Sequence, residues 1–298
     1  MKLSIREDKK WFWYLILAVF FTVLLLYIKF PSEAVTNYIR VQAEKSFPDL
    51  NISFKKIGLT LSPGIKIKGL TISFKTDPGA PVYFSEKSSL RVSIPGWLKG
   101  DPKYYFESYV KGGRISGIVE EKKEVKKDRV DATIDIEGIK LDENIFIHPV
   151  INERVEGVLT GKIIFMGNLS DPITGTTELS LNMADGKVKF LKPFLGMDRV
   201  NFKRINFSGV FDNRRLNIKD LKMTGGPLNG SASGTVRISN NLLNSRLNLK
   251  AEIEPLPSLS QEMPDVGKAI NLMKNRMKDG KLRFDITGTP DRPLPKIR

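Results

Sequence analysis

The strongest constraint on the fold is an alternation of apolar and polar residues that recurs from about residue 50 almost to the C-terminus. The clearest run covers residues 130–137, which read V-D-A-T-I-D-I-E. Such a run gives a strand one apolar face and one solvated face, which is typical of antiparallel sheet. Turn signals such as Gly112-Gly113 and Asp185-Gly186 separate the runs, and no βαβ spacing occurs. The sequence therefore predicts a mainly β fold.

Glycines stand where the alternation changes phase, at Gly69, Gly138, Gly157 and Gly209. A glycine inside a strand usually marks a bulge or a bend, and repeated bends curl a sheet. We therefore predict a curled antiparallel sheet, a groove or partial barrel; the alternative is that these are independent loop glycines. The apolar face is either open to a ligand or filled by side chains. Candidate lining residues are Ile65, Ile67, Ile134, Leu181, Phe202, Phe207 and Leu249.

The N-terminus carries an apolar run of 18 residues, Trp11 to Ile28, in which only Thr22 is polar. As a helix it would extend about 27 Å, close to the hydrocarbon thickness of a bilayer. Aromatic residues lie at both ends of the run, as in interfacial belts. The run predicts a transmembrane helix. Its candidate anchor residues are Trp11, Trp13, Tyr14, Leu17, Phe20, Leu24 and Tyr27.

Flanking cations predict the orientation of this helix. Lys2, Arg6, Lys9 and Lys10 precede it, whereas only Lys29 and Arg40 follow within about fifteen residues. We expect residues 1–10 to form a cytoplasmic tail, 11–28 a signal anchor and 31–298 an exported β-rich domain. In a diderm bacterium this means a single-pass inner-membrane protein with its bulk in the periplasm. A cleaved signal peptide is the alternative, although the run exceeds a usual h-region.

Two short amphipathic helices are predicted besides the anchor. The first carries an apolar stripe from Val35 to Phe47 and is stopped by Pro48. The second covers 264–277, with Val266, Ile270, Met273 and Met277 on one side. Such a stripe favours core packing over membrane contact or plugging of the sheet. The charged segment 119–129 is interpreted as a solvated hairpin tip.

Composition excludes several kinds of chemistry. The chain has no Cys and one His, so it has no thiol nucleophile, disulfide or multi-histidine metal site. His148 has no companion motif, and we predict no catalytic residue, no cofactor and no metal. Asp131, Asp135 and Glu137 share a strand face. A cation site is the alternative interpretation, and a solvated strand face is favoured. The net charge of +15 is dispersed, which favours an anionic lipid surface over nucleic acid.

Three segments resemble a known family. They are residues 61–72 (L-S-P-G-I-K-I-K-G-L-T-I), the stretch 225–238 that opens with G-G-P-L-N-G, and the strand end 286–290 (I-T-G-T-P). Together they resemble the type II secretion system protein N group, which is itself similar to AsmA-like envelope proteins. The resemblance implies an inner-membrane protein with a periplasmic β-groove and assigns no catalytic residue.

The resemblance implies two functions. In the first, the protein is a non-catalytic scaffold or assembly component of type II secretion that binds other proteins of the machine. In the second, the curled sheet carries the acyl chains of phospholipid or lipopolysaccharide towards the outer membrane, as AsmA-like proteins are linked to lipid supply. Both readings include the membrane as a partner, and neither includes nucleic acid.

Overall fold

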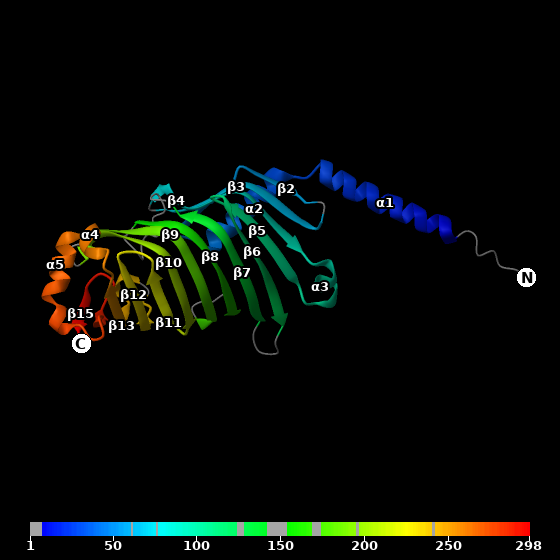
Figure 1. Cartoon of the computed structure of the whole chain (residues 1–298). Helices are drawn as coiled ribbons and strands as arrows, with labels where there is room; N and C mark the ends of the chain where they lie inside the picture. The colour runs from blue at the N-terminus through cyan, green and yellow to red at the C-terminus, as the bar shows by residue number, and fades with distance from the viewer. Residues whose placement is uncertain are drawn as a thin grey trace, which may run out of the picture.

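The computed structural model describes residues 8–60, 62–75, 77–123, 128–141, 154–168, 174–194, 197–239 and 242–298 (Figure 1). His148 and part of the predicted hairpin tip at 119–129 lie outside these residues. The described strands form one 15-stranded antiparallel sheet, in the order β1-β3-β4 and then sequentially to β15, with β2 also pairing with β3. The prediction of a mainly β fold is thus confirmed.

The strands are β1 (Leu50–Ser53), β2 (Lys56–Leu59), β3 (Gly64–Phe74), β4 (Asp77–Val92), β5 (Lys103–Val110), β6 (Gly113–Lys123), β7 (Asp128–Leu141), β8 (Arg154–Gly167), β9 (Thr176–Phe194), β10 (Met197–Asp212), β11 (Arg215–Thr224), β12 (Leu228–Arg237), β13 (Arg246–Pro255), β14 (Leu282–Gly288) and β15 (Pro293–Ile297). The helices are α1 (Asp8–Ile28), α2 (Ser32–Ser46), α3 (Ile94–Lys99), α4 (Leu259–Glu262) and α5 (Pro264–Leu272), with single 3-10 turns at Leu242–Asn244 and Lys274–Arg276.

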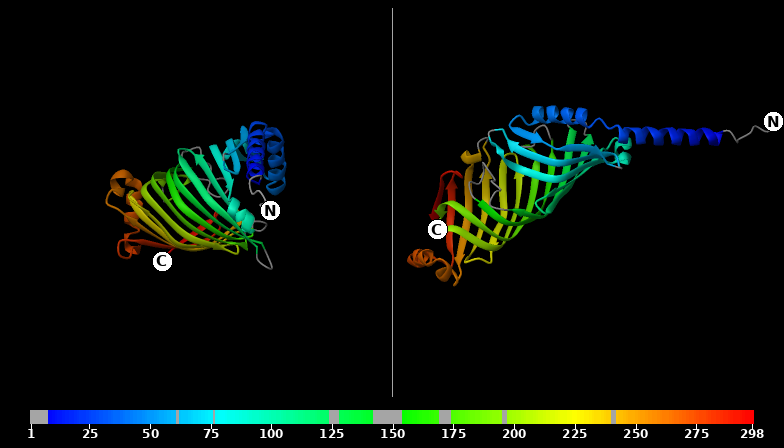
Figure 2. Two further views of the ribbon diagram at one scale, coloured as in Figure 1. Left: turned by 90° about the vertical axis from the view of Figure 1, so that its right-hand side faces the viewer. Right: turned by 90° about the horizontal axis from the view of Figure 1, so that it is seen from above.

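The sheet is open and curved (Figure 2). Its edges, β1 with β2 at one side and β15 at the other, do not pair with each other among the described strands. Register shifts accompany three of the glycines at which bends are predicted. They fall beside Gly138 in β7, at Gly157 in β8 and at Gly209 in β10. Gly69 adopts a left-handed φ of 62°, which a side chain would disfavour.

The N-terminal helices differ in what they contact. The predicted helix ending before Pro48 is confirmed as α2, which packs beside β1 and β2. By contrast, every side chain of α1 that the structure describes from Trp11 to Ile28 is exposed. Thr22 satisfies its hydroxyl within the helix by donating to the Ala18 carbonyl at 2.8 Å. Within the described part of the chain, no helix combines the length and hydropathy that crossing a membrane requires.

The C-terminal helices cover one end of the sheet. The helix predicted over 264–277 is shorter, since α5 ends at Leu272 and a 3-10 turn follows. Its stripe packs as core: Val266 and Ile270 are buried together with Leu259 of α4, while Met273 and Met277 lie against the same cluster. The sheet contributes Val200, Leu228, Leu282 and Phe284.

Candidate binding site on the apolar face

One face of the sheet carries an uninterrupted row of paired non-polar residues. Because directly paired residues of antiparallel strands point to the same side, the strand registers fix which residues form this row. It crosses every strand from β3 to β15. Its members are Ile65, Leu90, Phe106, Gly117, Ile134, Ile163, Leu179, Gly209, Ile218, Gly234, Leu249, Ile286 and Pro295. We call the side that bears this row the apolar face.

A second row runs beside the first on the same face. From Ile67 it passes through Ser88, Ser108, Ile115, Ile136, Gly161, Leu181, Phe207, Leu221, Ala232, Ala251, Phe284 and Ile297. The two rows bring together six of the seven residues predicted to line a groove. Ile65, Ile134 and Leu249 stand in the first row, and Ile67, Leu181 and Phe207 in the second.

Phe202, the seventh candidate, is buried. Its exposed fraction is 3%, and its ring lies against Gly186, the residue opposite it on β9. A Cβ on Gly186 would come within 2.6 Å of the Phe202 ring. Phe202 is therefore packed into the sheet. None of the seven predicted residues is among the described residues that line the cavity described next.

The apolar face holds a cavity of about 300 Å³ between its middle and its C-terminal end. Its walls include Ile205, Leu221, Ala251, Phe284 and Ile286, and the rest of the lining is almost entirely apolar as well. This volume is at the lower end of ligand pockets, which span roughly 300–1,000 Å³. The polar residues of the lining are Ser231 and Glu252, and the Glu252 carboxylate is paired with Arg283 at 3.0 Å. The otherwise apolar lining suits a hydrocarbon segment rather than a polar metabolite.

Glycines in the rows leave positions on the apolar face without a side chain, and neighbouring side chains cover them. At Gly117 the Phe106 ring lies across the position that a side chain would occupy, so that a Cβ there would be 2.6 Å from the ring. The same Cβ would be 2.5 Å from the Thr133 carbonyl oxygen. The aromatic side chain thus covers the backbone of its neighbour, a known way to protect glycine in a sheet.

A polar cluster interrupts the second row near its start. The Ser88 hydroxyl lies 2.7 Å from that of Ser108, and Ser85 donates to the Tyr109 carbonyl at 2.9 Å. Tyr83 completes the cluster through its contact with Ser108. No buried side-chain polar atom of the described residues lacks a partner. Within the described part of the chain these hydroxyls pair with one another and with backbone carbonyls, so the cluster is a satisfied network.

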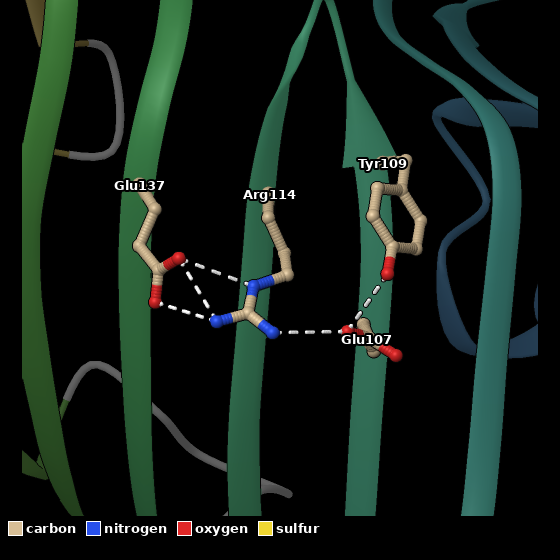
Figure 3. A network of polar contacts seen from close by, with 4 residues as sticks. All are labelled: Glu107, Tyr109, Arg114 and Glu137. Carbon is tan, nitrogen blue, oxygen red and sulfur yellow. Dashed lines mark hydrogen bonds and ion pairs between the residues drawn. The ribbon is translucent and has the colours of Figure 1, made fainter.

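The opposite side, the polar face, is held by cross-strand ion pairs (Figure 3). Arg114 of β6 contacts both carboxylate oxygens of Glu137 at 2.9 Å and donates to Glu107 at 3.2 Å. The Tyr109 hydroxyl donates to the same Glu107 carboxylate at 3.1 Å, which raises the pKa of Tyr109. The hydrogen bonds to Glu137 and Glu107 likewise raise the pKa of Arg114.

Asp131 on the same face is also paired. Lys122 approaches one of its oxygens at 2.5 Å and Arg129 the other at 2.8 Å. Partial burial alone would raise the pKa of Asp131, but the hydrogen bonds from Lys122 and Arg129 outweigh it and lower the pKa. Among the described residues no group of acidic or histidine side chains is arranged to hold a metal ion.

The sequence matches no protein-family model, no curated protein and no solved structure.

The cavity walls at Leu221, Ala251, Phe284 and Ile286 were not among the predicted lining residues. The alternation already assigns Ala251 to an apolar strand side. What the alternation lacks is the pairing order, which places Leu221, Ala251 and Phe284 in one row on four adjacent strands together with Ala232. Small side chains at 232 and 251 leave space between larger neighbours, and this becomes visible only once the strands are paired.

Proposed function

We propose that this protein is a membrane-anchored lipid-binding protein that holds acyl chains against its apolar face. The observation that carries the proposal is the first row, which is non-polar from β3 to β15, together with the apolar cavity at Ile205 and Ala251 on the same face. The second row adds apolar surface beyond its serines on β4 and β5. A path of this kind has no obvious use in a protein that binds only polar partners. It offers a hydrocarbon chain contact along its length.

The energetics favour such a ligand. Many residues of the rows are only half-buried, among them Ile134, Ile163 and Leu179. Covering apolar surface yields roughly 25 cal/mol per Å², so an acyl chain laid along the rows stabilises both itself and the sheet. Large contiguous apolar patches on soluble surfaces usually mark interaction sites.

Anchoring by α1 is part of the proposal, and it rests on the complete apolar run of the sequence rather than on the described residues of α1, which do not by themselves make a span. Its support is the run from Trp11 to Ile28 without a charged residue and the exposure of the described side chains there. Four cations precede the run, which favours a cytoplasmic N-terminus and an exported sheet. In a diderm bacterium the protein would then lie in the inner membrane with the sheet in the periplasm, where it takes up phospholipid or lipopolysaccharide.

The role in type II secretion stays a prediction from the resemblance. The apolar rows favour the lipid function because a scaffold that binds through strand edges or loops does not need them. We expect no catalytic step in the lipid function, since holding and passing on a lipid breaks no covalent bond.

The test uses two neighbouring positions on β13. Ala251 lines the cavity, whereas Lys250 is exposed on the polar face. We expect the full chain, extracted in mild detergent, to carry phospholipid or lipopolysaccharide detectable by mass spectrometry. Ala251→Phe should fill the cavity and strongly reduce the bound lipid, while Lys250→Phe should retain it.

Two outcomes would contradict the proposal. One is a lipid-free wild-type protein that instead captures secretion-machine proteins, which would favour the scaffold function. The other is equal lipid content in the two variants when circular dichroism shows both to be folded.

A further inference from the structure

A second apolar surface lies on α3, outside the apolar face. Trp97 and Leu98 are 66% and 73% exposed, and Ile94 is exposed beside them. Trp97 is the one tryptophan of the sequence outside the α1 run, which contains Trp11 and Trp13. Exposing a tryptophan and a leucine side by side on a short turn is unfavourable in water unless something covers them.

The turn that presents these side chains is well defined. The Ser93 hydroxyl accepts a hydrogen bond from the Gly96 amide, and the Ser93 amide donates to the Lys103 carbonyl at 2.8 Å. Gly100 closes the helix with φ of 83°, a left-handed conformation common at helix ends. A side chain at Gly96 would come within 2.6 Å of the Asp101 carbonyl oxygen. The backbone therefore holds Trp97 and Leu98 outward.

The position of α3 indicates what covers it. In two perpendicular views α3 lies at the end of the sheet from which α1 leaves, while α4 and α5 lie at the opposite end (Figures 1 and 2). If α1 enters a membrane, that end of the sheet faces the lipid. Lys99, in the last turn of α3, places a cation beside the exposed tryptophan. Tryptophan and lysine together are typical of the membrane interface.

From this arrangement we propose that α3 inserts Ile94, Trp97 and Leu98 into the interface of the membrane that α1 enters. This inference rests on the proposed anchoring and deepens it by a second point of contact. Leu90, a member of the first apolar row, stands on β4 a few residues before α3. A lipid leaving the membrane at α3 would therefore meet the beginning of the rows.

The test uses Trp97 as its own reporter. The full chain carrying Trp11→Phe and Trp13→Phe is reconstituted into vesicles of phosphatidylethanolamine and phosphatidylglycerol, with and without lipid bearing a nitroxide near the headgroup. We expect blue-shifted Trp97 emission and a loss of that emission in the nitroxide vesicles. Adding Leu98→Asp should diminish both effects.

The matched control lies at the far end. Leu272 on α5 is 87% exposed, so a protein with Leu272→Trp as its only tryptophan reports a site away from the membrane and should show no nitroxide-dependent loss. Likewise, Leu272→Asp in the Trp97 reporter should leave the Trp97 signal unchanged.

A third protein separates the inference from the proposed anchoring. Trp97→Phe leaves Trp11 and Trp13 as reporters of α1. If these two are quenched and Trp97 is not, the α3 contact is overturned while the anchor stands. If neither Trp97 nor the two tryptophans of α1 are quenched, the α3 contact and the proposed anchoring are both overturned. Equal quenching at Trp97 and at the Leu272→Trp site would also overturn the α3 contact, because it would show contact without a preferred end.

Discussion

The apolar face has two regions built from the same alternation but with different surroundings. At the C-terminal end α4 and α5 cover it, and Leu282 and Phe284 join Val266 in a buried cluster. Across the middle strands the same rows continue at Ile134 and Ile163, which stay half-buried. The difference teaches that an alternating strand makes a core only where another element covers it; elsewhere it leaves a surface for a ligand.

The largest predicted effect is a loss of unfolding free energy, and it distinguishes the covered end of the apolar face from its uncovered middle. Leu282 is 0% exposed, and Leu282→Ala should lower the free energy of unfolding by about 3 kcal/mol because it leaves a cavity. Ile163→Ala, in the uncovered region, should cost about 1 kcal/mol because less surface is lost from the interior. Urea unfolding in one detergent measures both. Equal losses of unfolding free energy in the two variants would mean that the middle of the apolar face is as well covered as its C-terminal end.

A smaller effect is expected on the polar face, where it concerns stability in acid. It shows how much an ion pair there contributes compared with the buried cluster of the apolar face. The pKa of Asp131 is lowered in the folded chain, below the ordinary value of about 3.9. Its ion pairs therefore stabilise the protein at neutral pH, and this contribution is lost as the pH falls through the folded pKa. Asp131→Asn should lower the melting temperature at pH 7.

The difference between wild type and Asp131→Asn should begin to narrow as the pH falls below about 4, and it should close only below the lowered pKa of Asp131 in the folded chain. Melting curves from pH 7 to pH 3 measure it. A difference that stays constant over this range would show that Asp131 contributes through packing rather than through charge. Lipid binding should be the same in both proteins at pH 7, because Asp131 lies on the polar face.

The smallest change in melting temperature is expected for a substitution of Arg114. Its pair with Glu137 is exposed and its pair with Glu107 is partly buried, and ion pairs near the surface contribute little. Arg114→Gln should shift the melting temperature only slightly, and less in high salt, where the pairs are already screened. A shift comparable to that of Leu282→Ala would mean that the polar face, and not the covered end of the apolar face, determines stability.

Much of the fold follows from the sequence because its signals are local. Alternation from residue 50 onward predicts antiparallel strands, and Gly138, Gly157 and Gly209 mark positions where the register shifts. The stripe of Val266 and Ile270 predicts a helix that packs as core. Each of these features depends on neighbours within a few residues, so a single sequence is sufficient to find it.

The site was only partly predictable because it depends on pairing between strands. Ile134 and Leu249 are more than a hundred positions apart in the sequence, and only the strand order places them in one row. Phe202 fits the same local pattern as Phe207 but packs on Gly186, which no local signal reveals. The short helix α3 escaped prediction because a six-residue turn is too short to show a period.

The most direct test of the central claim asks which side of one strand touches lipid. Leu249 stands in the first apolar row, and its neighbour Asn248 is exposed on the polar face. A photoreactive benzoylphenylalanine placed at either position in the full chain, in its own membrane, reports contacts by mass spectrometry after illumination. The lipid-binding account predicts lipid adducts at position 249 and not at 248. Equal labelling at both positions, or protein adducts alone at 249, would contradict it.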